Sequence, residues 1–523
     1  MESETPKVSL EKPAAAALPA EDYSFTYVPK APNTPAFDIQ SHDSLFAWLS
    51  LIFGFLFVRF VMVYADGFVT TGVFLLLHTA CMIYMKKSGC KILPAHRLMS
   101  AVIIAFSFVF SVTASELLHG LNLVFLMCAQ VWQVTAIGSG THFVTRFLPY
   151  DLSDSVLEAP FRCFGAGKQA MSESVKRSSS ASAVKTVLIG LLVTFPLTGL
   201  VGGLLANADS GVENMLRSAG SLLTDHVWMT LLQIAVGIPV GCWFFGMVYA
   251  AADRTVHPLK SEAGHESDLH RLRTIPNLGL YAGVTPICVL YLLYVISQTN
   301  YFLSAFAGRL PADMIYSEYA RRGFFELCAI AVINLLVILV LTGCAVKGGA
   351  ERPKALTFYA VMLSAFTLFI LATAFAKMLL YINAYGLTPL RLYTSWFMVL
   401  LAVVFLVLTV RQFTRSIHTA AILTTAFTVL FAVLCFSRPD ALIAEYNISR
   451  YEHGTLSNLD YPALTALSED ALLVLNAHSD TLRQIDAEEY CRDAAANCIR
   501  SYGTHPDRSW NLSAQLLKAQ AGS

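Results

Sequence analysis

The 523-residue chain is far more apolar than an ordinary soluble protein: 55% of its residues are hydrophobic, 34 are Phe, and only 14% are charged. Its 36 Lys and Arg balance its 36 Asp and Glu, so a formal net charge of zero provides no bulk attraction for nucleic acid. This composition argues against a soluble enzyme or a nucleic-acid-binding protein and favours an integral membrane protein.

The first 43 residues are predicted to be a disordered cytoplasmic tail. They contain six Pro, an Ala-rich run and only scattered apolar positions, which is too little apolar surface to form a core. No signal peptide fits this tail, because the first apolar run begins near residue 44 and continues as a full span. We therefore expect an uncleaved first helix.

Eleven apolar stretches follow, each long enough to cross a hydrocarbon core about 30 Å thick. Together they predict an all-α membrane protein with a polytopic bundle of about eleven transmembrane helices over residues 44–436. The expected spans are residues 44–64, 67–85, 98–115, 120–138, 185–206, 227–251, 278–297, 323–343, 357–382, 394–410 and 417–436.

The loops between these spans differ sharply in positive charge. One alternate set carries 19 Lys or Arg and the other set carries five. Because Lys and Arg resist translocation, the rich loops are predicted to be cytoplasmic. An odd number of spans then places the N-terminus in the cytoplasm and residues 437–523 outside it, and a bacterial inner (plasma) membrane is the simplest host.

Spans five, six and seven each carry a proline near the middle, namely Pro196, Pro239 and Pro286. A proline frees a helix carbonyl, which a transporter can direct at a substrate or an ion. The nearby pair Gly237-x-x-x-Gly241 permits close helix packing without any ligand. We favour packing and simple kinks, and we keep transport as the alternative.

Residues 437–523 are predicted to form a small extracytoplasmic helical domain. The segment is acidic, with twelve Asp or Glu against seven Lys or Arg. Its two cysteines, Cys491 and Cys498, lie two helical turns apart, a separation of about 10 Å that is too long for a disulfide, so we expect two separate thiols. Helices are expected near residues 460–478, 486–502 and 510–520.

Three segments in the C-terminal part of the chain form an ordered set: RRGFFEL from Arg321, YGLTPLR from Tyr385 and RPDALIAEYNISRY from Arg438. In this order they resemble an uncharacterised family of bacterial polytopic membrane proteins, a domain of unknown function. The resemblance implies a bacterial membrane location. It supplies no reaction, substrate or catalytic residue.

The predicted topology places the charges of these segments at the outer surface, close to Arg59 and Lys377 near the outer ends of their spans. Ionisable residues at such depth are costly, which favours pairing or function, and Glu326, Asp66 and Asp440 are the available counter-ions. An Arg-rich pocket for a phosphate or carboxylate is one interpretation. Snorkelling with structural ion pairs is the other, and we favour it. The members of this outer charged cluster are Arg59, Arg321, Arg322, Glu326, Lys377, Arg391, Asp440 and Arg450.

The sequence contains no phosphate-binding glycine loop, nucleophile elbow, His-Glu-x-x-His helix or dinucleotide fingerprint. We therefore predict no catalytic residue, no metal and no cofactor, and the protein is expected not to be an enzyme. Polar residues inside the spans, such as Gln130, Gln133 and Asn334, are expected to hydrogen-bond neighbouring helices rather than ligands.

Three functions fit these features, in decreasing order of preference. The first is a non-enzymatic cell-envelope protein that binds or senses a ligand outside the membrane. The second is a transporter or lipid translocator that uses spans five to seven, and the third is a membrane-embedded transferase acting on a lipid-linked substrate. The expected partners are the lipid bilayer and an anionic lipid or envelope ligand, with no nucleic acid and no oligomeric state predicted.

Overall fold

The computed structural model of the protein describes residues 37–63, 66–140, 147–176, 225–252, 275–297, 324–345, 353–414, 417–504 and 510–521, with a few isolated positions between these ranges. Within them, ten helices are long and apolar enough to cross a membrane. They coincide with ten of the eleven expected spans. The expected span at 185–206 and the tail up to residue 36 lie outside the described residues. The predicted all-α membrane fold is confirmed.

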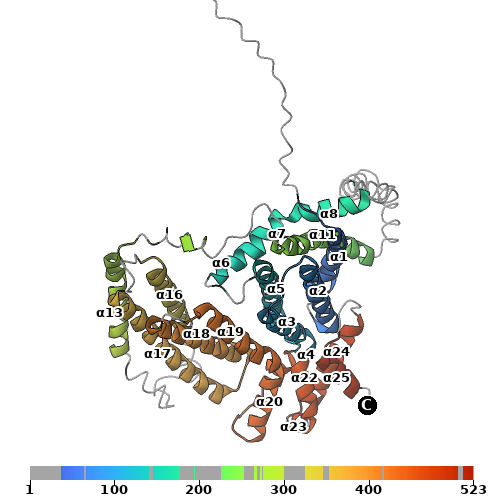
Figure 1. Cartoon of the computed structure of the whole chain (residues 1–523). Coiled ribbons are helices and arrows are strands. Elements are labelled where there is room, and N and C mark those ends of the chain that lie inside the picture. Colours follow the sequence, from blue (N-terminus) through green and yellow to red (C-terminus); the bar gives the residue numbers. More distant parts are fainter. Residues whose placement is uncertain are drawn as a thin grey trace, which may run out of the picture. The chain divides into compact units, whose positions relative to one another are not determined.

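The helices at the start of the chain pack together into a group that we call the N-terminal bundle (Figure 1). Their buried side chains form an aromatic core. Tyr84, Phe110 and Phe244 are each at most 2% exposed within it. Aromatic rings bury a large apolar area and pack edge to face, so such a core is well suited to holding helices together. The helices are α1 (Ser41–Leu56), which continues as the π-helix η1 (Phe57–Met62), α2 (Gly67–Lys87), α3 (Pro94–Ser107), α4 (Val109–Val112), α5 (Glu116–Ser139) and α11 (Asp225–Ala251).

Helices α1 and α11 pack so closely that their backbones are almost in contact where they cross. A Cβ on Gly54 would overlap the carbonyl oxygen of Gly237 and lie 2.5 Å from the backbone nitrogen of Gly241. Small residues four apart let two helix backbones approach closely. The packing interpretation of the pair Gly237-x-x-x-Gly241 is therefore confirmed, with Gly54 as the partner that the sequence pattern did not indicate.

Buried polar side chains within the spans bind one another or the backbone. The Nδ1 atom of His78 lies 2.9 Å from Oε1 of Gln130. Gln133 donates through Nε2 to the carbonyl oxygen of His96 at 2.9 Å. In the second half of the chain, Asn334 accepts from the Tyr291 hydroxyl at 2.7 Å and donates to Thr367 Oγ1 at 2.9 Å. The predicted role of these residues in joining helices is confirmed.

The later spans form a second group, the C-terminal bundle, with its own core around residues such as Ile370 and Phe405. Its last helix also packs against the N-terminal bundle, because Phe431 and Cys435 belong to the first core. The five helices are α13 (Asn277–Ser297), α16 (Phe324–Gly343), α17 (Lys354–Tyr385), α18 (Pro389–Phe413) and α19 (Thr419–Phe436).

Short helices cover one end of α11. The indole of Trp243 donates to the carbonyl oxygen of Val156 at 3.2 Å, and a Cβ on Gly246 would overlap the carbonyl of Pro160. These contacts hold the short helices that follow the fourth span against the N-terminal bundle. The helices are α6 (Leu148–Ser153), the π-helix η2 (Asp154–Glu158), α7 (Ala159–Arg162) and α8 (Phe164–Lys176).

The chain continues beyond the last span as six helices, here called the C-terminal helices. Ile443, Leu472 and Leu475 belong to the same core as the C-terminal bundle, and residues 37–523 form one compact packing unit. The division expected at residue 437 therefore does not appear as a break in the packing. The helices are α20 (Pro439–Glu452), α21 (Tyr461–Thr465), α22 (Glu469–Ala477), α23 (Ser479–Gln484), α24 (Glu488–Thr504) and α25 (Leu512–Ala521).

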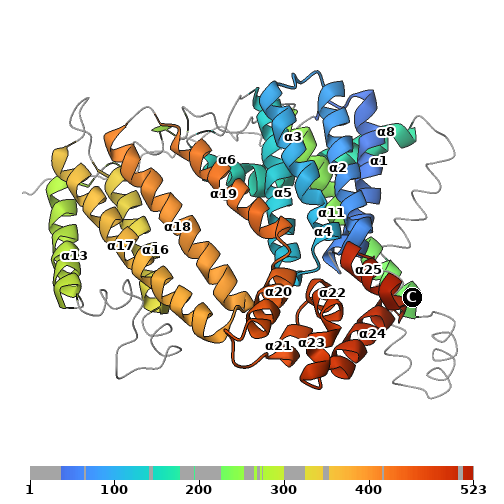
Figure 2. The same ribbon diagram turned by 90° about the horizontal axis from the view of Figure 1, so that it is seen from below.

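Hydrogen bonds attach the C-terminal helices to one common end of the spans (Figure 2). The backbone nitrogen of Phe68, at the start of α2, donates to the carbonyl oxygen of Trp510 at 3.1 Å. Asp470 of α22 accepts from Thr113 Oγ1 at 2.9 Å, beside the end of α4. The helix ends that were expected to share one membrane side thus meet the same set of helices.

Candidate functional site

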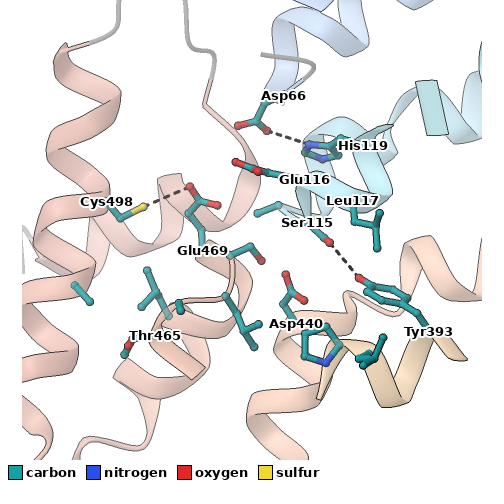
Figure 3. A pocket seen from close by; sticks show the side chains of 18 of the residues that line it. Asp66, Ser115, Glu116, Leu117, His119, Tyr393, Asp440, Thr465, Glu469 and Cys498 are labelled. Carbon is teal, nitrogen blue, oxygen red and sulfur yellow. Dashed lines mark hydrogen bonds and ion pairs between the residues drawn. The ribbon is translucent and has the colours of Figure 1, made fainter. Parts of the chain in front are cut away.

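A cavity of about 1050 Å³ lies where the C-terminal helices meet the span ends (Figure 3). Its walls come from the η1–α2 connection, the start of α5, the start of α18, and helices α20, α21, α22 and α24. No single segment builds it, so it exists only because the C-terminal helices are docked on both bundles. We call it the junction pocket. Its polar lining residues include Asp66, Ser115, Glu116, His119, Tyr393, Asp440, Thr465, Ser468, Glu469 and Cys498.

The junction pocket is acidic. Four carboxylates line it, from Asp66, Glu116, Asp440 and Glu469, and neither Lys nor Arg is among the lining residues that the structure describes. Asp66, Asp440 and Glu469 are only 8%, 5% and 6% exposed. Figure 3 shows all four side chains directed into the same space. Negative charges that line one cavity repel one another, so this lining favours binding of a positive charge.

Asp66 and Glu469 share one phenol. The hydroxyl oxygen of Tyr502 lies 3.2 Å from Asp66 Oδ2 and 3.0 Å from Glu469 Oε1. A phenol has one proton to donate, so it can satisfy only one of the two carboxylates at a time. Asn511 donates through Nδ2 to Asp66 Oδ1 at 3.4 Å and to the same phenol at 3.1 Å. Helix α24 and the residue before α25 therefore hold these acids in position.

His119 faces Asp66 from the first turn of α5. Its Nε2 lies 2.8 Å from the carbonyl oxygen of Thr113, and a carbonyl can only accept, so Nε2 carries a proton. Its Nδ1 lies 3.9 Å from Asp66 Oδ1. A second proton on this ring would sit on Nδ1, directly opposite the carboxylate. Both side chains form part of the wall of the junction pocket.

Asp440 lies in the first turn of α20, just after Arg438, whose backbone is left-handed with φ of 50°. Burial raises the pKa of the Asp440 carboxyl, the negative charges of Asp470 and Glu469 raise it further, and the polar groups of Ser468 partly offset these effects. A cation in the pocket would therefore stabilise the charged form of Asp440.

Asp470, the neighbour of Glu469, is fully buried but is not part of the pocket lining. Its Oδ1 accepts from Nη2 of Arg438 at 2.9 Å and from the hydroxyl of Ser513. Its Oδ2 accepts from Thr113 Oγ1 at 2.9 Å and from the backbone nitrogen of Ala114 at 3.0 Å. This fully satisfied carboxylate joins α22, α25, the residue before α20 and the α4–α5 turn.

Of the members of the predicted outer charged cluster that the structure describes, only Asp440 lines the junction pocket. Arg391 instead stacks on Tyr381, with its Cζ 3.9 Å from the ring centroid, and donates to the carbonyl oxygen of Gly386 at 2.5 Å. Arg450 donates to the carbonyl oxygen of Ile382 at 3.3 Å. Both arginines thus brace the loop between α17 and α18 and do not converge on a common cavity.

The remaining members of the cluster occupy separate elements. Arg59 lies on the π-helix η1 with its Cζ 5.6 Å from the Phe60 ring centroid. Lys377 is buried on α17, and Glu326 is exposed in the first turn of α16. The last two members, Arg321 and Arg322, lie outside the described residues.

The α17–α18 loop is also gripped by Asn447 of α20. The side-chain amide of Asn447 accepts from the backbone nitrogen of Leu387 at 2.7 Å and donates to the carbonyl oxygen of the same residue at 2.8 Å. Gly386 has φ of 79°, and a Cβ there would lie 2.5 Å from Asn447 Oδ1. The YGLTPLR and RPDALIAEYNISRY segments are therefore in contact, and this contact joins α20 to the α17–α18 loop.

The two predicted helix-break prolines that the structure describes do not line the junction pocket. Pro239 lies in α11 and Pro286 in α13, and both are exposed on helices of different bundles. The third predicted helix-break residue, Pro196, lies outside the described residues.

The two cysteines of the C-terminal helices are unbonded thiols, as expected. Cys498 lines the junction pocket and its Sγ donates to Glu469 Oε1 at 3.4 Å, whereas Cys491 is buried. Within the described ranges, no three side chains of His, Cys, Asp or Glu are arranged to hold a metal ion. The carboxylates of the pocket can pair with a positively charged group.

Sequence reasoning missed most of this site. Glu116, His119 and Glu469 are single ionisable residues near predicted helix ends, and no spacing in the sequence connects them. The sequence offered one indication of these three residues, namely that each lies next to the end of a span or helix on the predicted outer side. Asp66 carried that signal most clearly, because it stands alone in the shortest outer loop.

A family model described as a domain of unknown function (DUF4153) matches residues 100–478 of the chain. The chain belongs to the DUF4153 family. The matched part of this DUF4153 protein includes three of the four pocket carboxylates, Glu116, Asp440 and Glu469, together with the α17–α18 loop joint. The resemblance to an uncharacterised membrane-protein family is confirmed. No curated protein and no solved structure matches the chain.

Proposed function

We propose that this membrane protein binds a cationic ligand in the junction pocket and signals its presence through the C-terminal helices. The observation that supports this proposal is the set of four carboxylates without Lys or Arg among the described lining residues. The proposed ligand is therefore a cation, whereas the predicted arginine cluster suggested an anion.

The sign of the charge decides which ligand the pocket accepts. An ammonium about 4 Å from one such carboxylate gains about 4 kcal/mol at an effective dielectric constant of about 20. A phosphate at the same place is repelled by a similar amount from each carboxylate. Asp66 and Glu469 lie within hydrogen-bond distance of the same phenol oxygen, so two of the four carboxylates are close enough to act on one ammonium group together.

Binding and sensing are favoured over transport because of where the walls come from. A ligand in the junction pocket contacts the ends of both bundles and the C-terminal helices together, so it stabilises their docking by mass action. Neither of the two described prolines, Pro239 and Pro286, lines this pocket, so the pocket gives no support to a transporter that uses the proline-containing spans. A transferase is the weaker alternative, since carboxylates alone specify no reaction.

The proposal includes a location. We place the protein in a bacterial inner membrane with its N-terminus in the cytoplasm and the C-terminal helices outside, on the basis of the 19-to-five split of Lys and Arg between loops. A reporter that is active only outside the cytoplasm should function when fused after Ser523 and fail when fused after Lys91 or Lys260. A cytoplasmic result at Ser523 contradicts this orientation.

The charge of the ligand is tested with purified protein in an uncharged maltoside detergent. Spermidine, butylamine, phosphate and succinate are titrated while thermal stability is followed, and only the amines are expected to raise the melting temperature. The variants Asp440→Asn and Glu469→Gln should weaken the amine effect at least tenfold. Asp480→Asn, at a 93% exposed side chain, is the matched control and should leave it unchanged. Stabilisation by the anions alone, or equal amine effects in all variants, would overturn the proposal.

A further inference from the structure

We infer that the ligand of the junction pocket is an amine-bearing amphiphile, with its ammonium among the carboxylates and its apolar chain running down the outer face of α5. This inference rests on the proposed function and narrows it to one class of molecule. The rim of the pocket, rather than its acidic interior, indicates this class of ligand.

The rim is apolar at the level of the membrane boundary. Val63, Leu117 and Leu390 line the pocket and are nevertheless 50%, 52% and 67% exposed. Each lies at the end of a span: Val63 directly after η1, Leu117 in the first turn of α5, and Leu390 in the first turn of α18. An opening for a fully hydrated cation has no use for three large exposed aliphatic groups around it.

The apolar surface continues from the rim along the transmembrane helix. Leu121 and Val124 are 46% and 62% exposed on α5. With Leu117 they occupy positions i, i+4 and i+7, which fall on one face of a helix and cover about 10 Å of its length. On α18, Leu390 and Phe397 are likewise seven residues apart and exposed by 67% and 40%. The pocket therefore adjoins exposed apolar faces of two helices that are long and apolar enough to cross a membrane.

Charge and polarity complement one another in such a ligand. A cationic head group satisfies the carboxylates, and an alkyl chain stays in the bilayer while the head group enters from the membrane boundary. A small polyamine fits the interior but leaves the rim uncovered. A free fatty acid or a phosphate ester fits the apolar face but brings its negative charge against Asp440 and Glu116. An alkylammonium is the chemistry that matches both parts.

Occupancy of the pocket is measurable at Cys498, which lines it. The rate of maleimide alkylation of Cys498 is followed by peptide-resolved mass spectrometry in dodecyl maltoside. Cys90, which follows α2 and is absent from the pocket lining, is the internal control for accessibility. The probes are dodecylamine, butylamine and dodecanol, which separate the charge of the ligand from its chain.

We expect dodecylamine to slow alkylation of Cys498 at a concentration at least tenfold lower than butylamine, with no change at Cys90. Dodecanol should have no effect. The exposed rim variants Leu117→Gln and Leu390→Gln should remove the tenfold advantage of dodecylamine while keeping the butylamine response, which also shows that the variants fold. The pocket variant Asp440→Asn should weaken both amines.

The outcomes separate the two proposals. Equal potency of dodecylamine and butylamine overturns the amphiphile and leaves the cation-binding function standing. Protection by dodecanol as strong as by dodecylamine shows that an apolar additive suffices, which overturns the inference. Failure of both amines to protect Cys498 overturns the proposed function together with it.

Discussion

Replacing Asp470 by Asn should release the C-terminal helices from the span ends. Both carboxylate oxygens receive donors: Oδ1 from Arg438 and Ser513, and Oδ2 from Thr113 and the backbone nitrogen of Ala114. An asparagine amide has one oxygen and one NH₂ group. Whichever way it is turned, a donor then faces donors, and the guanidinium of Arg438 loses its counter-ion.

The magnitude follows from the burial of this joint. Asp470 is fully buried and the side chain of Arg438 is 27% exposed, so solvent replaces little of the lost interaction. Removing one partner of a buried, hydrogen-bonded ion pair costs about 3 to 5 kcal/mol. Since about 1.4 kcal/mol corresponds to a factor of ten, the undocked population should rise by about two to four powers of ten.

Hydrogen exchange measures this undocking directly. Amides of α22, α24 and α25 should exchange at least a hundredfold faster in Asp470→Asn than in the parent protein, whereas amides of α3 and α17 should be unaffected. The control is Asp480→Asn, whose partner Arg483 is 66% exposed, and surface pairs of this kind contribute about 0 to 1 kcal/mol. Acceleration of less than tenfold at the C-terminal helices, with the fold intact, would refute the reasoning.

Three further outcomes are expected. Gly386→Ala should lower the free energy of unfolding by about 1 to 3 kcal/mol, because φ of 79° with ψ near 180° is a conformation that glycine adopts and other residues avoid. The control is Gly283→Ala, where a Cβ meets nothing within 4 Å and the free energy of unfolding should not fall. Thermal melts compare the two variants. Gly54→Ala should cost about 1 to 3 kcal/mol through its overlap with α11, and Gly72→Ala should be neutral in the same melts. Asp440 has a pKa above its usual 3.8, so the folded state binds a proton that the unfolded state has lost, and stability without ligand should fall as the pH rises from 3.8 through that raised pKa. A cation favours the charged carboxylate, so amine affinity should rise across the same range, and titrations of Asp440→Asn should show neither trend.

The membrane fold was predictable from sequence because each span carries its own signal. A stretch of about 20 apolar residues satisfies its backbone internally, so length and composition suffice without knowledge of any neighbour. Ten of the eleven expected spans have matching helices. The pair Gly237-x-x-x-Gly241 was likewise readable, since close helix contact requires small residues at fixed spacing.

The site was much less predictable, because it depends on contacts between residues hundreds of positions apart. Asp66 and Tyr502 are 436 positions apart, and Thr113 and Asp470 are 357 apart. Nothing local in the sequence distinguishes Glu469, which lines the pocket, from Asp470, which anchors the fold. The arginines were misleading for a related reason, since a guanidinium satisfies backbone carbonyls and an aromatic face as readily as it binds an anion.

The two hydrogen bonds between Asn447 and Leu387 affect the junction pocket, although neither residue lines it. A side-chain amide that both accepts from and donates to one residue acts as a substitute peptide group, and it pins the register of α20 against the α17–α18 loop. Asp440 lies seven residues earlier, two turns along the same face of this helix. A slip of α20 by one residue would move that carboxylate about 1.5 Å along the axis and turn it by about 100°. A single asparagine two turns further along the helix thus sets the direction of the acid in the pocket.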